Sequence, residues 1–234
     1  SGDAFGMFGA TDGGVFDDQV DFARYESEMR RYYSNIVGKY SGMVQKALAK
    51  LSSARIGAIC PLHGLVWRSD PARVIGLYDR WSSYQGEDGG VVSYASMYGN
   101  TAQMADYIAR RIAEAGVKKV RVHDVSKTHI SYLINDIWRF KGVVLGSCAY
   151  NTQMFPLMES LTRELVHIGV KNRYLGLFGS YSWNGGGVKN LKLFADEIGW
   201  EQVAEPAEIM GRPACDKYAA CDALAAGMAG KLQH

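Results

Sequence analysis

The 234-residue sequence is poor in cysteine and proline, with four and five residues respectively. The cysteines form no Cys-x-x-Cys pair and are too few for a disulfide framework, which predicts reduced thiols in a cytoplasmic protein; they are Cys60, Cys148, Cys215 and Cys221. No apolar run approaches the roughly 18 residues of a membrane span. No block of lysine or arginine occurs, and the net charge is +2, so we expect neither a membrane nor a nucleic-acid partner.

The start of the chain also lacks familiar signals. It carries no signal-peptide pattern and opens on Ser-Gly-Asp, in a stretch rich in glycine and aspartate over residues 1–20. We therefore expect part of a longer chain. The hydrophobic content of 47% and the aromatic content of 12% are typical of a globular protein with a sizeable core. The length allows one large domain, or one ordinary domain and a smaller piece.

The first part of the chain is helical and has little sheet. Apolar residues recur at spacings of three and four over 21–51, with a break near Gly38, and the one strand candidate is 56–60. So few elements cannot close a core. We therefore expect residues 1–68 to be the remnant of a larger domain, and residues 69–90 to be a connecting helix followed by a flexible linker.

After residue 90, strands and helices alternate regularly. The strand candidates are 91–95, 119–125, 142–147, 174–179 and 202–209. The helical patterns between and after them are 101–115, 130–140, 155–168, 188–198 and 215–232. This alternation predicts an α/β fold with a doubly wound, five-stranded parallel sheet, and residues 91–234 fit a flavodoxin-like domain.

The turn after the first of these strands has the features of a phosphate site. Its residues lead from a β-branched run into a long amphipathic helix, and they are Ser96, Met97, Tyr98, Gly99, Asn100 and Thr101. Backbone N–H groups and the positive end of a helix dipole meet at such a turn. The turn has no lysine or arginine and lacks the spacing of a nucleotide P-loop, so it suits a lone phosphomonoester such as that of FMN. An ordinary strand–helix turn is the alternative.

Two further turns should meet the first one, because ligands in open α/β sheets bind beyond the carboxyl ends of the strands. The turn after the third strand runs from Ser147 to Thr152, and its candidate site residues are Ser147, Cys148, Ala149, Tyr150 and Asn151. The turn after the fourth contains Ser180, Tyr181, Ser182, Trp183, Asn184 and Gly185. Aromatic faces and closely approaching backbone amides suit a flavin ring. The alternative is that these aromatics are exposed or cap the core.

Five motifs in this order resemble those of the flavodiiron proteins, or A-type flavoproteins. They are Asp3-Ala4-Phe5-Gly6, Arg31-Tyr32-Tyr33-Ser34-Asn35-Ile36, Cys60-Pro61-Leu62-His63-Gly64, the turn 96–101 and Gly179-Ser180-Tyr181-Ser182-Trp183. The resemblance spans nearly the whole chain. It implies an incomplete metallo-β-lactamase-like segment, which in the family holds a non-haem diiron centre, before the flavodoxin-like FMN domain. It also implies reduction of dioxygen to water, of nitric oxide to nitrous oxide, or of both.

The resemblance assigns two metal ligands in the first segment. Asp3 matches the family's metal-bridging aspartate, and His63 matches its last metal-ligating histidine; carboxylate and imidazole both suit iron. Taken without the resemblance, these two residues are a turn aspartate and a loop histidine. The family has a tyrosine near the metals, which implies Tyr32 or Tyr33, with helix packing as the alternative role.

The chain departs from the family in one large respect. The His-x-Glu-x-Asp-His stretch and the further histidine that precede the family's counterpart of Asp3 are missing. Two ligands cannot hold two irons, so we expect a diiron site only with the missing N-terminal segment, whether truncated or a separate chain. This chain alone should have no catalytic residue and no reductase activity. The other histidines are expected to be structural or solvated: His123, His129, His167 and His234.

The expected function is electron transfer. FMN would accept electrons and pass them to the diiron site of an oxygen or nitric oxide reductase. The resemblance implies a rubredoxin-like or reductase electron donor and a head-to-tail homodimer or tetramer. Two alternatives stay open: a self-standing flavodoxin-type carrier or quinone-reductase-like module with an unrelated extension, and an α/β scaffold without a cofactor.

Overall fold

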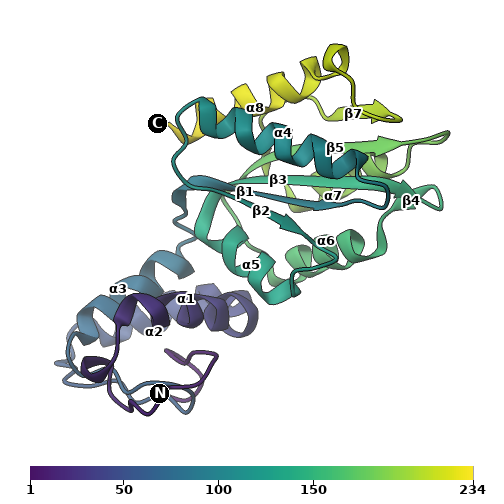
Figure 1. Ribbon diagram of the computed structural model, residues 1–234. Coiled ribbons are helices and arrows are strands. Elements are labelled where there is room, and N and C mark those ends of the chain that lie inside the picture. The colour runs from purple at the N-terminus through teal and green to yellow at the C-terminus, as the bar shows by residue number, and fades with distance from the viewer. Residues whose placement is uncertain (234) are drawn as a thin grey trace. The chain divides into compact units, whose positions relative to one another are not determined.

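The computed structural model describes residues 1–233, apart from the side chain of Cys215 (Figure 1). The predictions for His234 and for the Cys215 thiol lie outside the described residues. The chain divides into two compact units. The helical unit comprises Ser1–Gly86 with Ile168–Val170, and the sheet unit comprises Glu87–His167 with Lys171–His234. Within residues 1–233, no helix combines the length and apolarity that crossing a bilayer requires.

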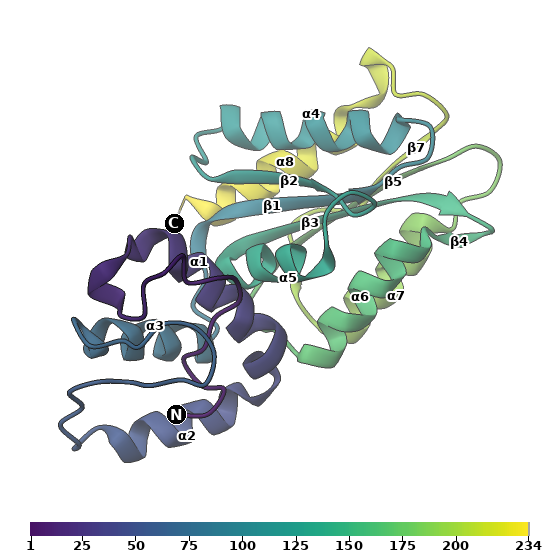
Figure 2. The same ribbon diagram turned by 60° about the horizontal axis from the view of Figure 1, so that its bottom comes forward.

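The helical unit is built on α1 (Phe22–Tyr32), α2 (Ser41–Leu51) and α3 (Pro71–Ser82) (Figure 2). The predicted break near Gly38 is confirmed, because a π-helical turn η2 (Tyr33–Val37) and a 3-10 turn η3 (Gly38–Tyr40) separate α1 from α2. A further 3-10 turn, η1 (Asp17–Gln19), precedes α1.

The strand predicted over 56–60 is wrong. Ile59 forms one antiparallel bridge with Trp67, through backbone bonds of 2.8 and 3.0 Å. A strand must pair its backbone groups along its length. The described residues offer this segment a partner at a single position, so the apolar pattern alone does not produce a strand.

Aromatic side chains hold the N-terminal segment onto α3. The hydroxyl of Tyr78 accepts a 2.6 Å hydrogen bond from the backbone N–H of Phe5, and the indole N–H of Trp67 donates to the Phe5 carbonyl at 2.8 Å. Tyr33 packs edge-on against Tyr78 with 4.9 Å between the ring centroids. Burial raises the pKa of Tyr33 to about 12 and also raises the pKa of Tyr78, so both hydroxyls stay neutral.

The sheet unit contains a parallel sheet in the order β2-β1-β3-β5-β6. Its main strands are β1 (Glu87–Ala95), β2 (Val120–Asp124), β3 (Phe140–Tyr150), β5 (Tyr174–Tyr181) and β6 (Glu201–Gln202). This is the flavodoxin-like order, with a switch point between β1 and β3. The predicted doubly wound, five-stranded parallel sheet is therefore confirmed.

The predicted fifth strand is split. It consists of β6 and β7 (Ala207–Met210), which both pair in parallel with β5. Pro206 lies between the two pieces and cannot donate a ladder hydrogen bond. A short strand that was not predicted, β4 (Gln153–Met154), pairs antiparallel with the end of β3.

Helices cover both faces of the sheet (Figure 1). One face carries α4 (Asn100–Glu114) and α8 (Ala219–Leu232), and the 3-10 turn η4 (Cys215–Lys217) precedes α8. The other face carries α5 (Ile130–Arg139), α6 (Pro156–Ile168) and α7 (Gly187–Ile198). The central strands are therefore buried on both sides, which explains the continuous apolar run in β3.

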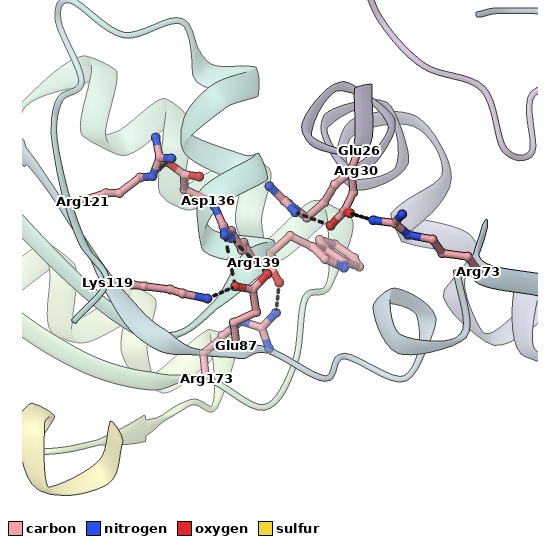
Figure 3. Close-up of polar contacts among 10 residues, drawn as sticks. Glu26, Arg30, Arg73, Glu87, Lys119, Arg121, Asp136, Arg139 and Arg173 are labelled. Atoms are coloured by element: carbon pink, nitrogen blue, oxygen red, sulfur yellow. Dashed lines mark hydrogen bonds and ion pairs between the residues drawn. The ribbon is translucent and has the colours of Figure 1, made fainter. Parts of the chain in front are cut away.

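The structure differs from the prediction of a connecting helix and flexible linker over 69–90. The helix α3 belongs to the helical unit, and β1 begins at Glu87, within the predicted linker. The carboxylate of Glu87 accepts hydrogen bonds from Lys119 Nζ at 2.8 Å and from Arg139 Nε at 3.1 Å (Figure 3). Burial raises the pKa of Glu87, but these two cations outweigh burial and hold the pKa below its usual value. The charge cluster anchors residues whose composition is otherwise that of a loop.

We expect Glu87→Gln to lower the free energy of unfolding by about 1 to 2 kcal/mol at pH 7, because the amide loses the charge-assisted bonds. A depressed folded-state pKa contributes stability above the unfolded pKa of about 4.3, and this contribution is lost as the pH falls. The difference between variant and wild type should therefore shrink below about pH 4 in urea unfolding followed by circular dichroism. Asp88→Asn is the control, because Asp88 is exposed and pairs with Lys141 at the surface. An equal deficit at both pH values would contradict the assignment.

Candidate functional site

The turns after β1, β3 and β5 surround one cavity of about 320 Å³, here called the strand-end cavity. It opens at the carboxyl edge of the sheet, beside the β1/β3 switch point. Eleven of the predicted site residues line it: Ser96, Met97, Tyr98, Asn100, Ala149, Asn151, Ser180, Tyr181, Ser182, Trp183 and Asn184. Thr152, the last residue of the predicted turn after the third strand but not one of the candidate site residues, lines it as well.

The first wall of the cavity is the turn between β1 and α4. Gly99 has a φ of +86°, which glycine adopts without strain, and its N–H donates to Ser96 Oγ at 3.1 Å. The helix begins at the next residue, Asn100. The first N–H groups of an α-helix have no intrahelical partner. Together with the helix dipole they make this turn a site for an anion.

A pair of buried hydroxyls joins this turn to β5. Thr101 Oγ1 and Ser180 Oγ lie 2.8 Å apart, and both side chains are buried. Ser180 reaches the cavity wall, whereas Thr101 lies behind it. The bond therefore fixes the distance between two of the three turns.

The remaining predicted residues support the cavity from outside its lining: Gly99, Thr101, Ser147, Cys148, Tyr150 and Gly185. Ser147 Oγ donates to the carbonyl of Cys148 at 2.8 Å and accepts from the N–H of Phe155 at 2.9 Å, so it shapes the turn after β3. The Tyr150 ring packs edge-on against Phe155. Burial raises the pKa of the Cys148 thiol, which keeps it protonated.

The lining is neutral and partly aromatic. It contains hydroxyls, amides and apolar groups but no aspartate, glutamate, lysine or arginine. Tyr98 and Trp183 are 84% and 89% exposed, so two aromatic side chains at the cavity are open to contact with a ligand. Loop amides and hydroxyls can take a phosphate, and aromatic faces can flank a flat heterocycle. The residues present therefore fit FMN.

The helical unit brings the two predicted metal ligands together. His63 Nε2 lies 3.2 Å from Asp3 Oδ1, and both side chains are more than half exposed. The two segments are joined by backbone hydrogen bonds from Leu62 N–H to the Gly2 carbonyl at 3.0 Å and from Met7 N–H to the His63 carbonyl at 3.1 Å. The backbone hydrogen bonds therefore hold the two loops that carry Asp3 and His63 side by side.

Tyr32 is the tyrosine beside this pair. Its ring lies 5.8 Å from the ring of His63, and burial together with a hydrogen bond to the Asp3 carboxylate raises the pKa of Tyr32. Tyr33 instead points into the helical unit, where its hydroxyl lies 2.8 Å from Ser41 Oγ. The residues described contain no group of three or more side chains able to hold a metal, so they do not by themselves fit a diiron centre.

The other described histidines have structural or solvated positions. His123 Nε2 lies 2.8 Å from Asp136 Oδ2. His129 caps α5, since its Nδ1 accepts from the N–H of Ser131 at 3.3 Å. The side chain of His167 is exposed on α6.

We expect Thr101→Val and Ser180→Ala each to lower the free energy of unfolding by about 1 to 3 kcal/mol, because each change leaves the other buried hydroxyl without its partner. The double variant should recover part of that loss, since no orphaned hydroxyl remains, and the coupling should be about 1 kcal/mol. Urea unfolding of the four proteins measures it. Strict additivity would show that the two hydroxyls do not depend on each other.

Comparison with known proteins agrees with the flavodoxin-like fold of the sheet unit. The family model described as flavodoxin matches residues 92–222. The anaerobic nitric oxide reductase flavorubredoxin of Shigella dysenteriae is 31% identical over 204 residues, which are 86% of this chain and 42% of that protein. The chain thus spans less than half of the curated relatives it matches.

Solved structures are similar over the whole chain. The rubredoxin oxygen:oxidoreductase of Desulfovibrio gigas superposes with a TM-score of 0.94 at 26% identity, covering 100% of this chain and 59% of that one. The flavodiiron protein of Giardia intestinalis shares the fold, with a TM-score of 0.89 at 22% identity and the same coverage. The chain therefore belongs to the flavodoxin family over its sheet unit and, over its greater part, to the flavodiiron proteins.

Proposed function

We propose that this chain binds FMN in the strand-end cavity and is the electron-transferring part of a flavodiiron oxygen or nitric oxide reductase. The observation that carries the proposal is the convergence of three strand-end turns on one neutral, aromatic-flanked cavity at the switch point of the sheet. A fold-level likeness alone would carry less weight, because one fold hosts many functions.

The chain's own residues bind and orient the cofactor. The amides of the turn 96–101 take the phosphate, with Ser96 and Asn100 at the cavity wall. Tyr98 and Trp183 flank the ring and exclude water from its faces. Bound FMN supplies the one- and two-electron transfers.

The acceptor reaction belongs to the complete protein. Relatives named for nitric oxide reduction and for oxygen reduction favour NO, O2 or both as the terminal acceptor. Their names also favour a rubredoxin-type donor, or a reductase. In this proposal, residues 1–68 are part of a metallo-β-lactamase-like domain in which Asp3 and His63 ligate iron, 69–90 connect the domains, and 91–234 form the FMN domain. This chain alone is inactive, because the metal ligands are incomplete.

The proposed assembly is a homodimer or tetramer arranged head to tail, in which one subunit's FMN serves another's metals. A separate chain could supply the missing N-terminal part. The proposed location is the cytoplasm, in keeping with the few cysteines.

A second candidate is a self-standing flavodoxin-type carrier or quinone-reductase-like module. It is favoured by the fact that every residue lining the strand-end cavity belongs to the sheet unit. Bound FMN fits both candidates, whereas iron bound by the completed protein fits the first alone.

We expect Trp183→Ala and Asn100→Asp each to weaken FMN binding by about tenfold, as measured by quenching of flavin fluorescence. The first change removes an aromatic face beside the ring, and the second adds a carboxylate beside the phosphate. Riboflavin, which lacks the phosphate, separates the two effects: Trp183→Ala should weaken its binding and Asn100→Asp should not. Unchanged FMN affinity in the aspartate variant would count against the phosphate turn.

Iron binding is expected to require the missing segment. The chain alone, incubated anaerobically with ferrous iron, should retain well under one iron after gel filtration, because two ligands leave most coordination positions to water. Supplying the missing segment from a relative as a second polypeptide should raise this to about two irons per complex, and Asp3→Asn should lower it again. Mass-spectrometric metal analysis reads out both. Full iron loading of the chain alone would contradict the incomplete site.

A further inference from the structure

The β3–β4 hairpin turn at the strand-end cavity is strained. Ala149 pairs with Met154, and Tyr150 pairs with Gln153, so the turn has two residues. These are Asn151 and Thr152, with φ values of +47° and +62°. Positive φ at both positions is what a type I′ turn requires, and Asn-Gly is the sequence that satisfies it without strain. A β-branched threonine in this conformation is an outlier.

The loop after β5 holds this turn in place. A Cβ on Gly186 would overlap the carbonyl of Thr152 and would lie 2.7 Å from the backbone N of Gln153. A Cβ on Gly187 would lie 2.6 Å from the carbonyl oxygen of Ser147. The two loops are therefore in backbone contact that only glycine permits, and the hairpin cannot relax toward the loop.

Asn151 and Thr152 both line the strand-end cavity, together with residues 180–184 at the end of β5 and in the loop that follows it. Backbone strain persists where surrounding structure over-determines it, and it gathers at ligand-binding sites. A wall that is fixed before the ligand arrives avoids the entropy cost of ordering on binding. The strained residue Thr152 thus lies in a part of the cavity lining whose position affects how well a ligand fits.

We propose that Thr152, locked by Gly186, is a positioning residue that fixes the width of the slot for a flat heteroaromatic ring. The inference rests on the proposed FMN binding and adds to it the element that sets the fit of the ring, as distinct from the phosphate. It predicts that relaxing the turn weakens ligand binding without weakening the fold.

The test is Thr152→Gly, studied without ligand and with FMN. Glycine relieves the backbone strain at this positive φ, and this gain outweighs the extra freedom that glycine gives the unfolded chain, so the unfolding temperature of the ligand-free protein should stay the same or rise. FMN should bind about tenfold more weakly, and riboflavin should lose the same factor, because the ring and not the phosphate is affected. Thr152→Asn should keep affinity within about twofold of wild type, since asparagine tolerates positive φ and keeps a side chain in the wall.

Matched control variants separate an effect on the cavity lining from the general effect of a glycine or alanine substitution. Asn172→Gly changes another non-glycine residue of positive φ, +59°, that is exposed and away from the cavity, and it should leave FMN affinity unchanged. Gly186→Ala should weaken FMN and riboflavin binding because it displaces the turn. Gly230→Ala, in α8 with open space around it, should not.

The outcomes are distinguishable. Weaker ring binding with unimpaired stability supports the positioning role. Unchanged affinity in Thr152→Gly overturns it, and so does a joint loss of stability and affinity, which is the behaviour of a residue that merely supports the fold. If the wild-type protein binds neither FMN nor riboflavin, the proposed function itself fails.

Discussion

The parallel register of β1, β3 and β5 is the constraint on which the site depends. Ala95 lies beside Ser147, and Ser147 lies beside Gly179, so the three strands reach the same edge of the sheet together. The turns that follow must then meet. The hydroxyl pair of Thr101 and Ser180 fixes their spacing. A shift of register in one strand would separate the turns, whatever their sequences.

Much of this sheet could be predicted from the sequence because buried parallel strands are continuously apolar and their helices have one apolar face. The errors have local causes. Within the described residues, the segment expected to be a strand over 56–60 forms a β-bridge only at Ile59. The start of β1 depends on contacts of Glu87 with Lys119, just before β2, and with Arg139 of α5. No local sequence pattern reveals these contacts. Pro206 is the signal in the sequence that indicates the division of the last strand into β6 and β7.

The site was predicted less completely than the fold, because a position in a loop does not say which way a side chain faces. Thr101 lies in the first turn of α4, and Ser147 and Cys148 lie near the end of β3; all three are next to the cavity but behind its lining. Thr152 lies in the predicted turn, but Asn-Thr is a poor hairpin signal, so the sequence does not show that this residue lines the cavity. The pairing of Asp3 with His63 joins segments 60 residues apart and followed from the family resemblance, not from spacing.

The wholly neutral lining of the strand-end cavity has a consequence for solution behaviour. A phosphate held by lysine or arginine is released as salt rises, since counterions compete for both partners. Hydrogen bonds from neutral amides and hydroxyls release no counterions, so salt screens only the helix-dipole contribution here. Occupancy of this cavity by a phosphorylated cofactor should therefore depend less on ionic strength than occupancy of a site lined by lysine or arginine, and high salt would be a less effective way to remove the cofactor.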